Sequence, residues 1–455
     1  MRTAIVFVAS ISLFAQASPE TGVTLAQAVT AALHNYPSIR VSQEQINAAA
    51  AGIQLARTAY LPRVDLLAQA NRATRNNVFG LLLPQSVIPS ISGPVIGTNN
   101  LETAWGSAVA TLVTWEPFDF GLRSATVAAA TAARRQSQAA LARTQFDVAV
   151  ATADAYVTLV AAGETIRAAQ AGVDRAQVVA QTIHALVNAQ LRPGADASRA
   201  DAELAAARTQ LIRAEQAADV ARANLSQFVG AEPAGIRVAA SRLLQLPPEP
   251  PVAPLNAAEN PAAVEQNATI ENLGAQLKIL ERSYFPRFYL QGSAYVRGTG
   301  AEMNGTILGG LNGLAPTVQN YALGLTVTFP VLNLVGIRAQ EAGQSATIRA
   351  EKARHEQIVT DLKARWNVAV ATLRGARNVA ANTPVQVAAA RAAADQATAR
   401  YQAGLGTVDT VAEAQRLLTQ AEIDDALARL GVWRGLLAVA TAAGDIQPFV
   451  AEASQ

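Results

Sequence analysis

The stretch Tyr60-Leu61-Pro62-Arg63 occurs a second time, with one conservative change, as Tyr284-Phe285-Pro286-Arg287. The prolines of the two stretches are 224 residues apart, and the same separation holds between Pro37 and Pro261. A shared offset at two places indicates an internal duplication rather than a chance match. We therefore read the chain as two equivalent halves.

The sequence after these stretches also repeats. Thr114-Trp115-Glu116-Pro117-Phe118-Asp119 resembles Thr328-Phe329-Pro330-Val331-Leu332-Asn333. Each half reads as a helix, a proline, an alternating strand, a loop, a second alternating strand, a very long helix, a glycine-containing turn and a return helix. Pro62 ends the first helix, because proline lacks the helical N–H donor and disfavours helical geometry at the residue before it.

The first half predicts three helices and two strands. A capping box at Thr24 and Gln27 starts a helix that runs to about Tyr60. The further elements expected are strands at 63–74 and 104–116, a helix from Phe120 to about Gln190, and a return helix from Ala197 to Phe228. The stretch Phe120–Gln190 contains no proline, and as one helix it would be about 105 Å long.

The second half predicts the same order. We expect a helix at 261–283, strands at 287–298 and 320–329, a helix from Val335 to Ala403, and a last helix to Gly444. Pro384 inside the long helix predicts a kink or a join between stacked helices. The resulting division is a signal peptide at 1–17, a first repeat at 18–230, a Pro-rich connector at 231–258, a second repeat at 259–445 and a tail at 446–455.

The N-terminus has the features of a secretory signal. Arg2 precedes the apolar run Ile5–Phe14, and Ala15-Gln16-Ala17 gives an A-x-A cleavage site. The chain has no cysteine, which excludes disulfides and an N-terminal lipid on cysteine. Beyond residue 17 no uninterrupted apolar stretch reaches about 18 residues, the length of a membrane-spanning helix. An exported chain of this kind is either periplasmic or part of a β-barrel.

Composition gives no sign of an enzyme, a cofactor site or a nucleic-acid partner. The net charge of this 455-residue chain is only +2, which is too small to indicate nucleic-acid binding. His34, His184 and His355 are scattered, without acidic or histidine partners at metal-ligand spacing. No phosphate-binding, nucleophile-elbow or dinucleotide motif is present. We therefore expect no catalytic, cofactor-binding or metal-binding residues.

Aromatic residues mark the ends of the predicted strands. Trp105 and Trp115 share a strand face and lie ten residues apart, about 33 Å along a strand. At the usual tilt this is about 25 Å of height, that of the apolar band of outer-membrane barrels. Tyr321 and Phe329 lie near the ends of strand 320–329 and complete the predicted girdle. A half-buried strand of a soluble sheet shows the same alternation, and four strands are too few to close a membrane barrel alone.

Several motifs resemble the TolC-type outer-membrane efflux protein family. Leu25-x-x-Ala28-Val29-x-x-Ala32-Leu33-x-Asn35-x-Pro37 is similar to its opening signature, and Ala56-Arg57-x-x-Tyr60-Leu61-Pro62 to its helix-to-strand junction. The segment Tyr401-x-x-Gly404-Leu405-Gly406-x-x-Asp409-x-Val411-x-Glu413-Ala414-Gln415 is similar to a helical-hairpin tip of the family. The resemblance extends over essentially the whole mature chain and both repeats.

This resemblance implies an α+β channel subunit. Four strands from each of three identical subunits would form one barrel in the outer-membrane lipid, continuous with a periplasmic barrel of long helices. The hairpin turns, here 190–198 and 403–410, would dock onto a periplasmic adaptor protein bound to an inner-membrane transporter. The function implied is a passive export duct for a tripartite efflux pump or for type I secretion.

The resemblance also suggests site residues. Glu413, nine positions after Gly404, is the first choice for a ring of acids at the periplasmic aperture, and Asp409 is the second. Thr410 stands where the family can carry another acid. An acidic ring repels anions and attracts cations, although a solvated acid near a helix end has the same sequence appearance. Candidate adaptor-docking residues at the tips are Arg192, Gly194, Asp196, Tyr401, Gly404 and Gly406.

Two other functions fit the sequence less well. A soluble periplasmic coiled-coil adaptor predicts one helical hairpin flanked by small β domains, without a duplication of hairpin and strands. An exported helical enzyme needs a cluster of polar catalytic residues, which the sequence does not contain. The channel is the preferred interpretation.

Overall fold

A computed structural model describes residues 22–74, 102–239, 242–249, 254–302, 304 and 306–454. The predicted signal peptide therefore lies outside the described residues. The chain forms two compact units. We call them the hairpin unit (Met1–Ser42, Ala140–Val264 and Gln357–Gln455) and the sheet unit (Gln43–Ala139 and Glu265–Glu356).

The first helix of the repeat is divided in two. Helix α1 spans Leu25–Asn35, and α2 spans Pro37–Thr58. The capping box of Thr24 and Gln27 is present. We expected one helix to about Tyr60, and this was wrong. Pro37 forces the preceding Tyr36 into extended geometry, with φ −69° and ψ 125°.

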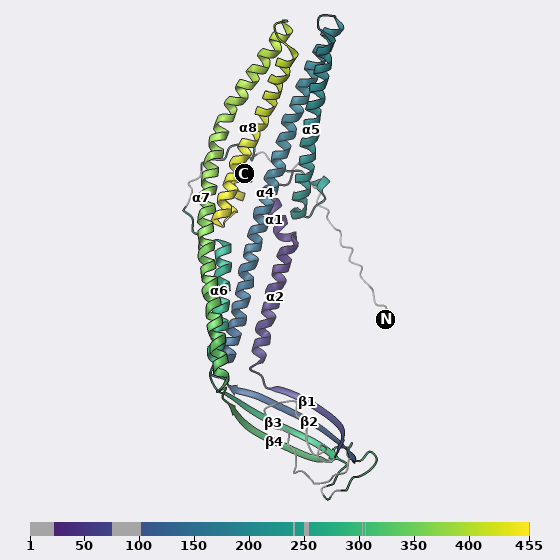
Figure 1. The fold of residues 1–455 in the computed structure, drawn as a ribbon, viewed down its shortest axis with the longest axis vertical. Coiled ribbons are helices and arrows are strands. Elements are labelled where there is room, and N and C mark those ends of the chain that lie inside the picture. Colours follow the sequence, from purple (N-terminus) through teal and green to yellow (C-terminus); the bar gives the residue numbers. More distant parts are fainter. Residues whose placement is uncertain are drawn as a thin grey trace, which may run out of the picture. The chain divides into compact units, whose positions relative to one another are not determined.

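Four long helices form two hairpins (Figure 1). The first is α4 (Leu122–Asn188) with α5 (Gly194–Val229), and the second is α7 (Asn333–Gln402) with α8 (Val408–Ala443). Helix α6 (Pro261–Arg282) precedes the second pair of strands. Helix α7 continues through Pro384 without a join.

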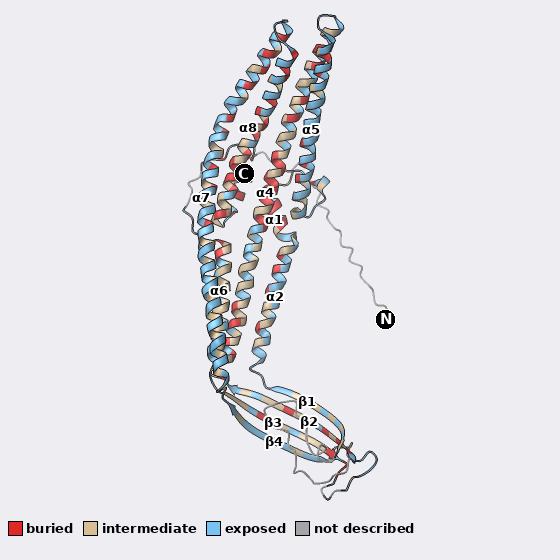
Figure 2. Ribbon diagram, viewed as in Figure 1, coloured by how far each residue is buried: buried red, intermediate tan, exposed pale blue. Residues whose placement is uncertain are grey.

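Helix α5 of the first hairpin and helix α7 of the second each bury only a narrow seam (Figure 2). The seam residues of both helices recur at alternating steps of three and four, which is the heptad pattern of coiled coils. On α5 they are Ala197, Ala200, Leu204, Ala207, Leu211, Ala214, Ala218, Ala221 and Leu225. On α7 they are Leu362, Trp366, Ala369, Leu373, Ala376, Ala380, Thr383, Val387, Ala390, Ala394, Ala397 and Tyr401. Alanine is the most frequent seam residue, and its small side chain lets neighbouring helices approach closely. Because the seam is narrow, most of the surface of each helix stays exposed.

The sheet has four antiparallel strands in the order β1-β2-β3-β4. They are β1 (Arg63–Thr74), β2 (Thr103–Phe118), β3 (Arg287–Thr299) and β4 (Val318–Thr328). The strands of the two halves meet where β2 pairs with β3. Strands β1 and β4 are therefore the edges of the sheet.

The core of the hairpin unit surrounds two large buried aromatic residues. The hydroxyl group of Tyr156 on α4 donates a hydrogen bond shared by two carbonyl oxygens. Its oxygen lies 2.9 Å from the Val23 carbonyl oxygen and 2.7 Å from that of Ala239. Burial raises the pKa of Tyr156 to about 12. Trp433 on α8 is fully buried and donates its ring N–H to the Gln245 carbonyl at 2.9 Å.

The C-terminal segment is folded rather than a loose tail. Residues Gln447–Ala453 form helix α9, and Phe449 packs against Trp433 with ring centroids 6.2 Å apart. Two helices, Leu122–Asn188 and Val408–Ala443, contain an 18-residue window apolar enough to cross a membrane. Half of the window in the first and 44% in the second is buried inside the protein, as in core helices.

Candidate functional site: hairpin tips and the apolar sheet face

The turn of the second hairpin depends on glycine. Gly404 has φ +78°, a left-handed conformation that glycine adopts without a steric penalty. The N–H of Leu405 donates to the Arg400 carbonyl at 2.8 Å and closes the end of α7. Thr407 then caps α8, because its side chain accepts from the N–H of Thr410. Thr410 is thereby a part of the helix start.

The turn of the first hairpin is built differently. Gln190 takes the left-handed conformation, with φ +60°. Pro193 is the N-cap of α5, and Gly194 is its first residue. A Cβ atom on Gly194 would meet no other atom within 4 Å. Close packing therefore does not require glycine at this position.

Tyr401 joins the two turns. Its side chain is 3% exposed, and its hydroxyl donates to an Asp196 carboxylate oxygen at 3.2 Å. The Arg192 guanidinium lies 4.5 Å from the centre of the Tyr401 ring and donates to the Tyr401 carbonyl at 2.8 Å. Burial, together with the negative charge of Asp196, raises the pKa of Tyr401 above its usual value. The tyrosine therefore remains a neutral donor at physiological pH.

An apolar cluster continues from Tyr401 along both hairpins. Ile183 on α4 is fully buried, and Val411 on α8 is 1% exposed. They pack with alanines of α5 and α7, namely Ala197, Ala200 and Ala397. The described tips are thus held together by apolar packing as well as by the Tyr401 hydrogen bonds.

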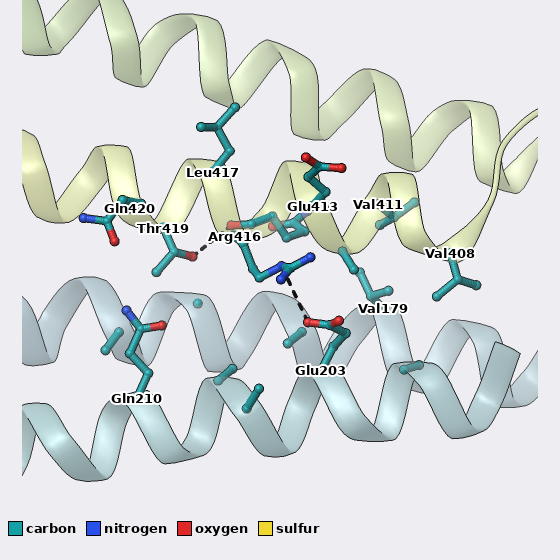
Figure 3. Close-up of a pocket in the computed structure, with 18 residues that line it drawn as sticks. Val179, Glu203, Gln210, Val408, Val411, Glu413, Arg416, Leu417, Thr419 and Gln420 are labelled. Carbon is teal, nitrogen blue, oxygen red and sulfur yellow. Dashed lines mark hydrogen bonds and ion pairs between the residues drawn. The ribbon is translucent and has the colours of Figure 1, made fainter.

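The three predicted aperture residues have different surroundings. Asp409 forms an ion pair with Arg199 of α5 at 3.1 Å. Thr410 contacts the Thr407 hydroxyl at 2.9 Å. Glu413 is exposed and forms no ion pair with any residue that the structure describes. Its carboxylate points away from Glu203, on the other side of α8 (Figure 3).

A cavity of about 530 Å³ lies between α4, α5 and α8, close to these residues (Figure 3). Small residues such as Ala169, Gly172 and Ala207 form much of its wall. Arg416 spans the cavity and lies 3.8 Å from the Glu203 carboxylate. The two hairpins are therefore incompletely packed in this region.

One face of the sheet is almost wholly apolar. The register places Leu66, Thr111, Ala294 and Tyr321 in one row of this face. Other rows of the same face contain Val64, Val109, Val113, Leu290, Val296, Leu323, Leu325 and Val327. Polar side chains such as Asp65, Gln69, Asn71, Gln291 and Asn320 alternate onto the opposite face. This separation is that of a membrane barrel strand, with lipid on one side and water on the other.

Three of the predicted girdle residues lie within the sheet, each at a different level. Trp105 and Trp115 share the apolar face and stand near its two ends. The Trp115 ring N–H donates to the Tyr60 carbonyl at 3.2 Å. Tyr321 is on the same face but is level with Thr111, between the two tryptophans. Phe329 follows the last residue of β4 and is 54% exposed.

The family model for outer membrane efflux proteins matches residues 28–231 and 254–445. The chain belongs to this family. The two matched segments coincide with the two halves of the chain and confirm the duplication. This efflux protein is accordingly an outer-membrane channel subunit that extends into the periplasm.

Solved structures of outer-membrane channels share the fold of the efflux protein. The Campylobacter jejuni CmeC channel is 14% identical, with a TM-score of 0.74 over 100% of this chain and 98% of that chain. The open state of the Neisseria gonorrhoeae MtrE channel is 18% identical, with a TM-score of 0.72 over 93% and 90%. VceC from Vibrio cholerae is 17% identical, with a TM-score of 0.70 over 92% and 96%. No curated protein matches the chain.

A charged cluster between the two hairpins was not predicted from the sequence. Arg175 of α4 donates to Thr419 at 2.8 Å and to Glu422 at 2.9 Å, both on α8. Glu422 also pairs with Arg391 of α7 at 3.3 Å. Gly172 permits the close approach, since a Cβ atom there would lie 2.9 Å from the Thr419 hydroxyl. We call Arg175, Thr419, Glu422 and Arg391 the hairpin clamp.

A second missed feature fixes the junction between β2 and α4. Asp119 accepts hydrogen bonds from the N–H groups of Gly121 and Arg123, and from the Arg123 side chain at 2.8 Å. The Arg123 guanidinium also lies 4.8 Å from the centre of the Tyr60 ring. Burial alone would raise the pKa of Asp119, but these hydrogen bonds outweigh it and lower the pKa. Phe120 has φ +50°, so this elbow holds a strained backbone in place.

Proposed function

We propose that three copies of this efflux protein share one 12-stranded barrel and form a passive duct. The observation that carries the proposal is a sheet with one apolar face and two open edges. The exposed fractions are 83% for Leu66 on β1 and 77% for Leu323 on β4. A long exposed edge strand is normally paired or protected, and four strands are too few to close a barrel. Pairing β1 of one copy with β4 of the next satisfies both edges.

The helices then provide the periplasmic part of the duct. Helices α5 and α7 each bury a single coiled-coil seam. The rest of each helix surface is therefore free to contact neighbouring subunits, water or partner proteins. We propose that turns 190–198 and 403–410 face the periplasmic entrance. There they would dock a periplasmic adaptor and, through it, an inner-membrane transporter. The efflux family favours a tripartite efflux pump over type I secretion.

The tips would also be the gate of the duct. Tyr401, Asp196 and Arg192 join the two hairpins of one subunit. Movement of the second hairpin away from the first therefore requires these contacts to break. We propose that Glu413 forms the acidic ring of the aperture. Asp409 and Thr410 are less suited, because Arg199 pairs with the first and the second carries no charge.

The proposed duct has no catalytic step, because transport energy would come from the inner-membrane transporter. Maturation would remove residues 1–17, and N-terminal sequencing of the exported protein tests this. The first mature residue is expected to be Ser18. An intact N-terminus on the exported protein would contradict it.

Cross-linking tests the shared barrel directly, since the natural chain has no cysteine. Cysteines along the apolar face of β1, such as Leu66→Cys, are combined in turn with cysteines along the same face of β4, such as Leu323→Cys or Leu325→Cys, and oxidation is followed on denaturing gels. If β1 of one copy pairs with β4 of another, one combination gives covalent dimers and trimers, because disulfides need Cα atoms within about 7 Å. Single-cysteine variants are the matched controls. Absence of cross-links for every β1–β4 pair along both strands would contradict the shared barrel.

A further inference from the structure

Arg72 is a charged residue in an apolar setting. It lies on the sheet face that carries Leu66, Val109 and Leu325, and it is exposed. Among the described strand residues it is the one charged side chain on this face. The other strand arginines, Arg63, Arg287 and Arg297, alternate onto the polar face. An exposed cation on a lipid-facing surface therefore has to be explained.

The level of Arg72 on the sheet explains why it is tolerated. Arg72 is paired with Trp105 near the C-terminal end of β1. This end of the strand is the one farther from helix α2. A cation on the lipid face of a barrel is costly at the membrane midplane and costs little near the headgroups. Trp115 marks the end of the same face that lies next to the helices, which is the periplasmic end of the proposed barrel. Arg72 and Trp105 therefore mark the outer boundary of the apolar band.

The guanidinium of Arg72 is held in place by two neighbours. Its Nε donates to the Thr103 hydroxyl at 3.1 Å. Its central carbon lies 5.6 Å from the centre of the Trp105 ring. No described residue bonds its two terminal nitrogens. These nitrogens form the planar fork that arginine uses to bind two oxygens of one phosphate.

We propose that Arg72, oriented by Trp105 and Thr103, binds the phosphate of a lipid headgroup in the outer leaflet. This inference rests on the proposed membrane barrel. A lipid is the occupant favoured by position, because the fork lies at the border of a continuous apolar surface suited to acyl chains. The phosphate then lies at headgroup level, where the arginine also meets the least cost of desolvation.

The test uses the purified full-length protein in detergent. Native mass spectrometry measures occupancy by a phosphorylated outer-leaflet glycolipid (lipid A) and by the same glycolipid after phosphatase treatment. Arg72→Gln is expected to raise the concentration for half-occupancy by lipid A about tenfold, as for loss of a charge-assisted hydrogen-bonded pair. Arg72→Lys, which keeps the charge without the fork, is expected to lie between wild type and Arg72→Gln.

The control variant is Arg63→Gln, on the same strand but on the polar face, where Arg63 pairs with Asp65. It is expected to bind lipid A as wild type does. Dephosphorylated glycolipid is expected to bind wild type and Arg72→Gln equally and weakly. Equal binding of the two lipids by wild type would overturn the proposal. Displacement of lipid A by millimolar inorganic phosphate would also overturn it, because the site would then be one for free anions.

Assembly is measured on the same samples. If Arg72→Gln does not assemble, Arg72→Lys compared with Arg63→Gln decides the outcome by the same criteria. An assembled oligomer whose lipid A binding is unaffected by Arg72 variants contradicts this inference and leaves the channel intact. A wild-type protein that is monomeric and soluble contradicts the proposed barrel itself.

Discussion

A guanidinium nitrogen of Arg175 on α4 lies 2.9 Å from a carboxylate oxygen of Glu422 on α8, which ties the two hairpins together away from their tips. Both side chains are largely shielded, with exposed fractions of 24% and 18%. An ion pair in such a site is stronger than one at the surface, because water screens it less. The hairpin clamp is therefore a second connection that has to break if the hairpins separate.

Glu422→Gln is expected to weaken the closed arrangement. The substitution removes the charge shared by Arg175 and Arg391 and costs about 1–2 kcal/mol of charge-assisted hydrogen bonding. Single-channel conductance in planar bilayers should shift toward larger or longer openings. Asp424→Asn, two residues further along α8, is the matched control and should conduct as wild type does. Equal conductance of Glu422→Gln and wild type would show that the hairpin clamp does not contribute to gating.

Tyr401→Phe is expected to open the tips by removing the hydroxyl that donates to Asp196. Asp196→Asn keeps an acceptor and should have a smaller effect. Because the folded-state pKa of Tyr401 is raised, its contribution is complete below the normal tyrosine pKa, about 10, and is lost as pH rises through the folded value. Wild-type conductance should therefore increase under alkaline conditions, whereas Tyr401→Phe should lack this increase. A parallel alkaline response of both proteins would argue against the Tyr401 contact.

Glu413→Gln is expected to reduce the preference of the channel for cations over anions. Glu413 is exposed without an ion-pair partner among the described residues, so three copies would present uncompensated charge. Asp409→Asn should change selectivity less, because Arg199 already pairs with Asp409. Reversal potentials in a salt gradient measure both variants. A larger effect of Asp409→Asn would place the narrowest ring at that residue instead.

Asp119→Ala is expected to destabilise the junction between β2 and α4. Side chains of Asp119 and Arg123 are only 9% and 10% exposed, and removal of one partner of a buried pair costs about 3 kcal/mol or more. Asp119→Asn should be milder, since an amide oxygen can still accept from the backbone. Thermal dissociation of the purified oligomer measures both.

The lowered pKa of Asp119 also predicts that the stability of the oligomer depends on pH under acidic conditions. The pKa of Asp119 is lowered in the folded protein, so its stabilising contribution is present above the unfolded value, about 3.9, and is lost as pH falls through the folded value. The oligomer should lose thermal stability below about pH 4, and Asp119→Asn should lose less of it. An identical acid profile for both proteins would show that other carboxylates dominate.

Much of the fold followed from local sequence. The duplicated Tyr-x-Pro-Arg stretches locate the helix-to-strand junctions, and strand alternation places Trp105 and Trp115 on one face. The break at Pro37 was missed because the apolar pattern continues across it, although proline chemistry alone could have indicated it. The folded end of the chain was missed because helix α9 depends on tertiary packing of Phe449 against Trp433.

Long-range geometry could not be read from the sequence. The level of Tyr321 depends on the register of β3 with β4, which no local pattern specifies. Arg175, Arg391 and Glu422 are far apart in sequence, and each looks like an ordinary solvated charge of a long helix. The surroundings of Glu413 and Asp409 differ only because Arg199 is placed opposite one of them. Ion pairs between the two hairpins can therefore be identified only from the three-dimensional structure.

We propose that several copies of this chain form one membrane channel. The most direct test is fractionation of the expressed, signal-processed protein, followed by mass determination of the detergent-extracted species with and without boiling. We expect a species in the outer-membrane fraction with three times the subunit mass, which dissociates to the subunit on heating. A monomer or dimer recovered in the soluble periplasmic fraction would contradict it.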